Sequence, residues 1–223
     1  MPAPTAVLLS AGLDSAVLAA AEARAGLVQP LYVSTGLAWE RGERAALDRL
    51  LASAPFAVNI APVARLSFTV EDVYPATHWA LCGTPPAFDT ADEDVYLAGR
   101  NVVLLSKAAI YCSQNGINRI VLGPLAGNPF PDATPRFFET MARALSLGLD
   151  HTIVVDTPFL SMEKSDVIRL GVELGVPLEL TLSCMNPQDG RHCGQCSKCR
   201  ERRDAFHDAG VEDPTTYATV PLR

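Results

Sequence analysis

Short apolar runs alternate with longer segments of helical periodicity along most of the chain, and this alternation limits the folds available to it. The runs Thr5–Leu9, Leu27–Ser34 and Phe56–Ile60 are predicted strands, and the segments Asp14–Ala25 and Glu40–Ser53 between them are predicted helices. Strands that are separated by helices pair in parallel, and the helices then cover the faces of the sheet.

The alternation continues in the second half of the chain. Proline-rich segments at 75–95 and 123–135 are predicted surface loops, and around them we expect strands at 119–122 and 152–155 and helices at 102–112, 137–147 and 165–174. The sequence therefore predicts an α/β fold over residues 1–180, with a parallel five-stranded sheet and helices on both faces. Residues 181–223 change in composition, and we expect them to form a small appended module.

The composition of the 223-residue chain excludes several classes of protein. A hydrophobic content of 48% is enough for a folded core and too high for disorder. The net charge of −7 argues against broad binding to nucleic-acid phosphates. No apolar run reaches the length of a membrane span, and the N-terminal Met-Pro-Ala-Pro-Thr lacks the basic start of a signal peptide. We expect a cytoplasmic protein with no membrane or nucleic-acid partner.

The stretch Leu9 to Ser15 joins the first predicted strand to the first predicted helix. The start of a helix binds anions, because it presents unpaired N–H groups and the positive end of the helix dipole. Gly12 permits close approach of the backbone, Ser10 and Ser15 offer hydroxyl groups, and Asp14 could cap the helix or hold Mg²⁺ beside phosphates. An ordinary strand-to-helix turn is the alternative.

The string Ser10-Ala11-Gly12-Leu13-Asp14-Ser15 resembles the S-G-G-x-D-S pyrophosphate loop of the N-type ATP pyrophosphatases, or PP-loop proteins. The resemblance implies that residues Leu9 to Ser15 hold the phosphates of ATP. It also implies that the sheet is Rossmann-like, of the HUP or adenine nucleotide alpha hydrolase-like type. Ala11 stands where the family has its first glycine, and alanine fits there without strain only if its φ is negative.

Four of the six cysteines crowd into the pattern C-x8-C-x2-C-x2-C near the C-terminus. Four thiolates fill the tetrahedral shell of Zn²⁺, so we expect a structural zinc site made by Cys184, Cys193, Cys196 and Cys199. An iron–sulfur cluster is the alternative, although ferredoxin-type runs have a further cysteine where this chain has Arg203. Cys82 and Cys112 are expected to be unliganded, and Cys112 to be a small core residue.

Basic residues follow the last cysteine closely. Their spacing suggests a solvated face of a helix rather than a nucleic-acid site, and the residues concerned are Lys198, Arg200, Arg202 and Arg203.

The phosphate loop and the cysteine pattern together resemble the 7-cyano-7-deazaguanine synthase (QueC) family. Three further stretches carry the resemblance: "YLAGRNVVLLSKAAIY", "FPDATPRFFETMARALSLGL" and "DTPFLSMEKSDVIRLGVELGVPLELTLSC". The resemblance implies an ATP-dependent ligase of queuosine biosynthesis. It would convert 7-carboxy-7-deazaguanine and ammonia to 7-cyano-7-deazaguanine (preQ0) through an adenylated carboxylate and an amide. The resemblance also suggests a homodimer.

The same resemblance implies roles for individual residues. The catalytic set is Asp14, Ser15, Arg100 and Lys164; the phosphate loop Leu9 to Ser15 binds ATP together with Gly99, Arg100, Asn101 and Gly123; and Asn101 and Asp132 read the deazaguanine. The cofactors are ATP, Mg²⁺ and structural Zn²⁺. Residue type alone leaves plainer roles open, with Arg100 and Lys164 as surface charges, Asn101 as a helix N-cap and Asp132 as part of a turn.

Other functions stay open at this point. Residues 35–40, "TGLAWE", replace the aromatic-Gly-Gln-x-His string of the family, so a relative that transfers the activated carboxyl to another amine is one alternative. A non-catalytic zinc-knuckle binding module is another. A ligase or sulfurtransferase acting on tRNA would need a basic surface, which an acidic chain does not favour.

Overall fold

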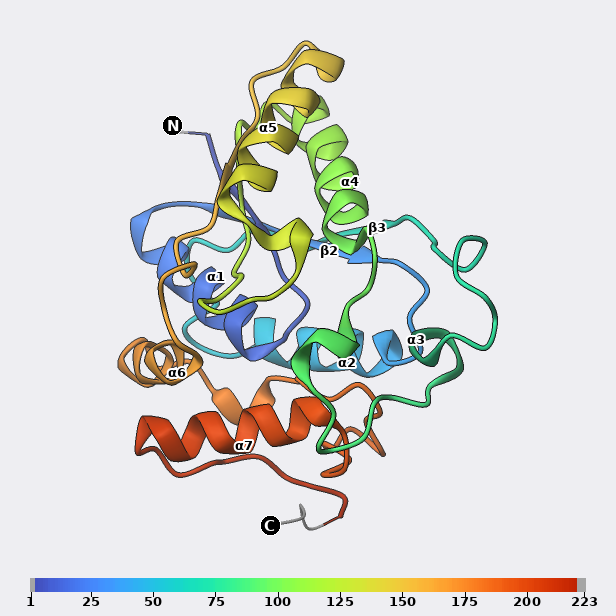
Figure 1. The fold of residues 1–223 in the computed structure, drawn as a ribbon. Helices are drawn as coiled ribbons and strands as arrows, with labels where there is room; N and C mark the ends of the chain where they lie inside the picture. The colour runs from blue at the N-terminus through green and yellow to red at the C-terminus, as the bar shows by residue number, and fades with distance from the viewer. Residues whose placement is uncertain (1–2, 220–223) are drawn as a thin grey trace.

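Five parallel strands form one sheet in the computed structural model, which describes residues 3–219 (Figure 1). The strand order is β3-β2-β1-β4-β5, so the two strands next to the central β1 are reached by crossovers in opposite directions. The strands are β1 (Thr5–Leu8), β2 (Val28–Ser34), β3 (Ala64–Ser67), β4 (Arg119–Val121) and β5 (Val154–Asp156). The predicted Rossmann-like α/β fold is confirmed.

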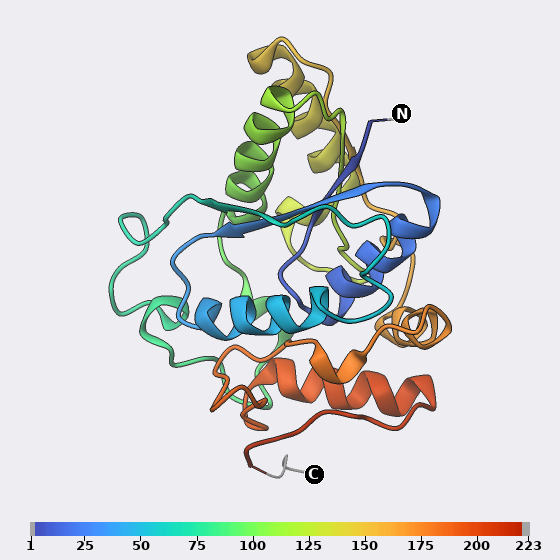
Figure 2. The ribbon, with the colours of Figure 1, turned by 180° about the vertical axis from the view of Figure 1, so that it is seen from behind.

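Helices cover both faces of this sheet. One face carries α4 (Arg100–Gln114) and α5 (Pro135–Leu149), which stand side by side in both views (Figures 1 and 2). The other face carries α1 (Leu13–Ala25), α2 (Glu40–Leu51) and α6 (Lys164–Glu173), and α7 (Ser197–Ala209) packs against α6 beyond them. The shorter helices are α3 (Trp79–Cys82), η1 (Asp92–Val95), η2 (Pro131–Ala133) and η3 (Leu178–Leu180).

The alternation of side chains along the central strand divides the interior into two cores. In β1, Ala6 faces the core beneath α4 and α5, whereas Val7 faces the core of α1, α2 and the C-terminal segment. Both side chains are completely buried. Because β1 is covered on both faces, its sequence is a continuous apolar run, as expected for an interior parallel strand.

The predicted third strand at Phe56–Ile60 is wrong. These residues form turns, in which Phe56 is buried in the core and Ile60 makes one isolated bridge to Val28. The strand is β3 instead, whose residues Ala64 to Ser67 are alternately half-buried and exposed at the edge of the sheet. An apolar run identifies a buried strand, and it fails for an edge strand with one solvated face.

The segment 75–95 is also more ordered than predicted. It contains α3 and η1, and Ala80 and Val95 within it are buried. The segment 123–135, which was expected to be irregular throughout, contains η2. Both segments line the same edge of the sheet, where they form walls of a cleft described below.

The predicted solvated face of α7 is wrong for Arg202, which is fully buried. Its guanidinium donates hydrogen bonds to the Leu178 carbonyl (2.8 Å), the Thr181 hydroxyl (2.9 Å) and the Ser183 hydroxyl (3.2 Å). Arg202 therefore joins α7 to the segment that follows η3. The division of the chain into residues 1–180 and 181–223 stays a prediction.

Cys112 is fully buried within α4, as predicted for a small core residue, and Cys82 is exposed. Among the described residues, no helix combines the length and apolarity needed to cross a bilayer.

Candidate active site and metal centre

The loop after β1 lies at the carboxyl edge of the sheet, between the two crossover directions. In open parallel sheets this switch point is where ligands bind. Gly12 is the N-cap of α1, and the first turn of this helix therefore points its unpaired N–H groups toward the cleft edge. The Gly12 N–H donates to the Ser10 hydroxyl (3.3 Å), and the Ser15 hydroxyl donates to the Gly12 carbonyl (3.0 Å). Asp14 is not the N-cap, because Gly12 occupies that position and Asp14 lies in the first turn of α1.

Ala11 adopts a φ of +65°, in the left-handed region that glycine prefers. An L-residue in this region is strained by contact between its Cβ and the backbone. Alanine is therefore strained at this position. The strain explains why the family has glycine there. Ala11 is fully buried, and its carbonyl accepts a 2.8 Å hydrogen bond from the Leu182 N–H.

Lys164, the first residue of α6, reaches the phosphate loop. Its ammonium lies 3.1 Å from Asp14 Oδ2 and also pairs with Glu201 of α7. Burial disfavours the charged ammonium, but the carboxylates of Asp14 and Glu201 outweigh it and raise the pKa of Lys164. The side chain is therefore a permanent cation at the loop, and it is not an ordinary surface charge, since only 15% of it is exposed.

Glu201 extends this chain of charges into α7, where its other oxygen pairs with Lys198. Burial opposes ionisation of Glu201, but the two lysines lower its pKa well below the usual range. Lys198 is thus part of a half-buried ionic group rather than of a solvated face, which corrects the prediction for this residue. Sequence reasoning missed Glu201, which stands in a highly charged run directly after the last cysteine.

Two adjoining lobes make up the cleft above the phosphate loop. The strand lobe encloses about 300 Å³ over the ends of β1, β2 and β4, and the α7 lobe encloses about 440 Å³ toward α6 and α7. Both are lined by Ser10, Gly12, Asp14, Glu43, Arg100 and Gly123. The lobes therefore meet at the phosphate loop.

The structure brings most of the predicted site residues to this cleft. Leu9, Ser15, Asn101 and Asp132 line the strand lobe, and Leu13 and Lys164 line the α7 lobe. Ala11 and Gly99 are not among the described lining residues. They are backbone positions with positive φ, and Gly99 (φ +77°) is the N-cap of α4.

Asn101 and Asp132 form one polar unit at the rim of the strand lobe. The Asn101 N–H donates to Asp132 Oδ2 (3.1 Å), and the Asn101 side-chain amide donates to the Asp132 carbonyl (2.8 Å). Asn101 is therefore not an N-cap, since α4 begins at Arg100 and Asn101 lies in its first turn. Burial raises the pKa of Asp132, and the Asn101 N–H and nearby Arg100 oppose that effect.

Glu43 in α2 is a cleft residue that sequence reasoning missed. It lines both lobes, and its carboxylate accepts hydrogen bonds from the Tyr32 hydroxyl (3.1 Å) and the Trp39 indole N–H (3.2 Å). A signal existed, because Glu43 shares its helical spacing with the buried Leu47 and Leu50. The spacing places this carboxyl on the inner face of α2, although it stands in the charged run "ERGER".

Glu40 and Trp39, within residues 35–40, have structural roles. Glu40 accepts hydrogen bonds from the Thr35 N–H (2.6 Å) and from the hydroxyls of Thr35 and Ser34, so it caps the end of β2. Trp39 stacks on Trp79 of α3, with ring centroids 5.8 Å apart, and both line the α7 lobe. The stacked pair Trp39 and Trp79 was not predicted, because Trp79 lies in a segment that was expected to be an irregular loop.

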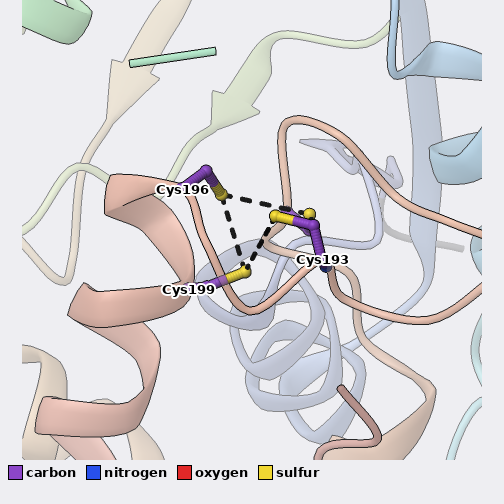
Figure 3. A group of neighbouring side chains, drawn as sticks. Cys193, Cys196 and Cys199 are labelled. Atoms are coloured by element: carbon purple, nitrogen blue, oxygen red, sulfur yellow. Dashed lines mark hydrogen bonds between the residues drawn. The ribbon is translucent and has the colours of Figure 1, made fainter. Parts of the chain in front are cut away.

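The four predicted metal ligands converge on one point. The sulfur atoms of Cys184, Cys193, Cys196 and Cys199 all lie within 4.8 Å of one another, and the four side chains are buried. Figure 3 shows the thiols of Cys193, Cys196 and Cys199 turned toward a common centre. Cys196 is also the N-cap of α7, so the cluster fixes the start of the helix that carries Lys198 and Glu201.

The spacing of the sulfur atoms suits a single tetrahedral ion. Sulfur ligands about 2.3 Å from Zn²⁺ lie about 3.8 Å from one another in a tetrahedron. The sulfur–sulfur distances of 4.0 Å (Cys184–Cys196), 3.8 Å (Cys193–Cys199) and 3.5 Å (Cys196–Cys199) agree with this value. The Asn186 and Cys193 N–H groups also donate to the Cys184 sulfur, and such hydrogen bonds orient and stabilise a metal-binding thiolate.

A parallel sheet with a phosphate loop at its switch point and a lysine held against that loop defines a nucleotide-binding protein of the PP-loop class. More specifically, the chain belongs to the family described as queuosine biosynthesis protein QueC, which matches residues 5–210.

Relatives named 7-cyano-7-deazaguanine synthase align along almost the whole chain. The protein of Methanopyrus kandleri is 37% identical and covers 96% of this chain and 99% of its own. That of Methanoculleus marisnigri is 34% identical (94% and 96%), and that of Anaeromyxobacter dehalogenans is 36% identical (95% and 94%).

Solved structures share the fold at low sequence identity. A U34-tRNA thiolase, NcsA, from Methanococcus maripaludis, solved with its 4Fe-4S cluster, superposes with a TM-score of 0.50 at 10% identity. The match covers 93% of this chain and 67% of the thiolase.

Proposed function

We propose that this protein is an ATP-dependent ligase that makes 7-cyano-7-deazaguanine from 7-carboxy-7-deazaguanine and ammonia. ATP first adenylates the substrate carboxylate, ammonia then displaces AMP to form an amide, and a second activation removes water to form the nitrile. The family membership and the names of the relatives support this assignment.

The observation that carries the proposal is the position of Lys164 at the phosphate loop, in a cleft with two lobes. Activation of a carboxylate by ATP brings two anions together, and fixed cations must offset their repulsion. Lys164 and Arg100 supply those charges, and the N–H groups of the loop with Ser10 and Ser15 supply hydrogen bonds to the phosphates.

The residues of the loop also fit a magnesium ion. Asp14 Oδ1 is buried and lacks a hydrogen-bond partner among the described residues, so it is an oxygen acceptor that needs a ligand. We assign Asp14 to hold Mg²⁺, which neutralises charge on the ATP phosphates when bound. Zn²⁺ is the ion we assign to the four cysteines, where it has a structural role.

The strand lobe has the composition of a site for a flat heterocycle. Its lining includes the apolar residues Leu8, Leu31 and Leu122 and the polar residues Asn101 and Asp132. A carboxylate can accept hydrogen bonds from the N–H groups on the guanine-like edge of the substrate, which is the role we give Asp132.

A mass-spectrometric assay tests the assignment directly. Purified protein is incubated with ATP, Mg²⁺, ammonium and 7-carboxy-7-deazaguanine, and we expect preQ0 to appear as ATP is consumed. Amide or adenylate alone would instead favour a relative with another acceptor. Asp14→Ala should abolish turnover, and Asp72→Ala, at an exposed position, should not. Activity that survives Asp14→Ala would contradict the role of the loop.

Two coarser features complete the proposal. We place the protein in the cytoplasm, where four clustered thiols stay reduced and free to bind metal.

A homodimer is the assembly that the resemblance to the family suggests, and light scattering of the purified protein measures it.

A further inference from the structure

Glu43 is a buried carboxyl at the junction of the two lobes. Its side chain lines both of them, and the residue is 8% exposed. A buried carboxyl is costly to ionise unless it is paired with a cation or receives strong hydrogen bonds. It lines the same cleft as Ser10, Gly12 and Asp14 of the phosphate loop.

The donors that hold Glu43 are neutral and rigid. Tyr32 donates from β2 and Trp39 donates from the residue that precedes α2, and both side chains are themselves buried. Neutral donors orient a carboxylate without cancelling its charge, and although their hydrogen bonds lower the pKa of Glu43, burial outweighs them. Tyr32 and Trp39 therefore fix the direction of Glu43 while leaving it able to accept a proton.

The groups around Glu43 shift its pKa in opposite directions. Burial raises its pKa from 4.5 to about 7; Arg100 of α4 lowers it, Glu40 of α2 raises it, and the hydrogen bonds from Tyr32 and Trp39 lower it. A group with a pKa near the working pH is the most effective proton acceptor, because its basic form is both populated and strong enough.

The other carboxyls of the cleft have fixed partners. Asp14 and Glu201 pair with the Lys164 ammonium, and Asp132 receives the Asn101 N–H. Glu163 belongs to the capping box of α6. Lys164 and Lys198 lower the pKa of Glu201, so Glu201 is a weaker base at neutral pH than Glu43.

We propose that Glu43 accepts the proton that the nitrogen nucleophile loses in the amide-forming half-reaction. The inference rests on the proposed function, in which ammonia attacks the adenylated carboxyl. A C–N bond forms, the C–O bond to the phosphate breaks, and AMP leaves with the electron pair of that bond. The nitrogen then carries one proton too many, and the Glu43 carboxylate takes it, becoming neutral.

Separate assays of the two half-reactions distinguish a failure of this inference from a failure of the proposed function. Adenylation needs no proton acceptor and is followed by exchange of labelled pyrophosphate into ATP that depends on 7-carboxy-7-deazaguanine. Amide formation is followed by mass spectrometry. For Glu43→Gln we expect exchange within about threefold of wild type and amide formation at least about 100-fold slower, within the range for loss of a general base. The adenylate should then accumulate.

The variant preserves the local hydrogen bonds. The Gln oxygen can accept from the Trp39 indole, and its amide can donate to the Tyr32 hydroxyl. Retained exchange shows that the variant is folded and binds both substrates. A matched variant, Tyr32→Phe, removes a donor that lowers the pKa of Glu43 and keeps the carboxyl itself.

The pH dependence gives a readout that a structural role would not move. The wild-type rate of amide formation, divided by the concentration of free ammonia, should rise with pH around 7. Tyr32→Phe should shift this rise to higher pH, and Glu43→Gln should remove it. Amide formation by Glu43→Gln at the wild-type rate, with exchange intact, would overturn the inference alone. If the wild type shows no exchange, the proposed function fails and the inference fails with it.

Discussion

The Leu182 N–H donates a hydrogen bond of 2.8 Å to the carbonyl of Ala11. Leu182 lies two residues before the first metal ligand, Cys184, and Ala11 lies inside the phosphate loop. The contact joins the loop to the segment that enters the cysteine cluster. Together with the Asp14–Lys164–Glu201 chain of ion pairs, it makes the geometry of the phosphate loop depend on the C-terminal segment.

The strain at Ala11 predicts an unusual tolerance to glycine. Replacing Ala11 by Gly relieves about 1–2 kcal/mol of left-handed strain, and it forfeits a similar amount through loss of a buried methyl group and greater freedom of the unfolded chain. We expect the free energy of unfolding to change by less than about 1 kcal/mol. The control Ala19→Gly, at a buried position in α1, should lose about 2 kcal/mol. Urea denaturation measures both, and equal losses would contradict the strain.

Metal binding should be stoichiometric and coupled to nucleotide affinity. We expect a colourless protein with one zinc ion per chain by elemental analysis. Cys196→Ser should lose the metal and weaken ATP binding at least about tenfold, because the start of α7 and the Leu182 contact lose their support. Cys82→Ser, at an exposed cysteine outside the cluster, serves as the control. Wild-type affinity for ATP in metal-free Cys196→Ser would exclude the coupling.

Glu201 is expected to position Lys164 rather than to bind substrate. Glu201→Gln leaves the ammonium of Lys164 with Asp14 as its anionic partner and makes the α7 lobe more positive. We therefore expect kcat to fall about tenfold, equivalent to about 1.4 kcal/mol, while the KM for ATP does not rise. Steady-state kinetics separate the two constants, with Glu212→Gln, at an exposed position, as the control. A rise in KM at constant kcat would indicate a binding role instead.

The buried carboxyl of Glu43 predicts a pH-dependent cost to stability. Its pKa rises from 4.5 to about 7 on folding, so the folded state holds more protons than the unfolded state between these values. Stability that Glu43 contributes at low pH is therefore lost as the pH rises through this window, by about 3 kcal/mol at most. Glu43→Gln should gain stability relative to wild type between pH 5.5 and pH 8, measured by urea denaturation at both. A constant difference between the two proteins would contradict the raised pKa.

Prediction from the sequence was most successful where a single periodicity, helical or strand, determines which residues are buried. The longer helices and four of the five strands could be predicted because their buried faces repeat at helical or strand spacing. β3 could not, since its residues Ala64 to Ser67 lie at the edge and only half of them are shielded. The convergence of the four cysteines could also be predicted. Their spacing, with two Cys-x-x-Cys pairs and one longer loop, allows all four sulfur atoms to reach one point.

Residues that act across the fold were harder to find. Lys198 and Glu201 stand among charges and resemble a solvated helix face, and only the packing of α7 against α6 turns them toward Lys164. Trp79 was hidden in a segment without periodicity. For Arg100, Asn101, Asp132 and Lys164, the chemistry of the side chain alone favoured plain roles, and it was the resemblance to a family that pointed to the cleft.

The arrangement of the cleft has a consequence for the order in which the protein is made. The phosphate loop leaves the ribosome first and α7 follows nearly two hundred residues later, yet Asp14, Lys164 and Glu201 belong to one chain of ion pairs. A nascent chain that has exposed only β1 and α1 carries the nucleotide motif without its cationic partners. The ion-pair chain at the cleft is completed when the cysteine segment and α7 have emerged, so a growing chain lacks the full set of charges at the phosphate loop until then.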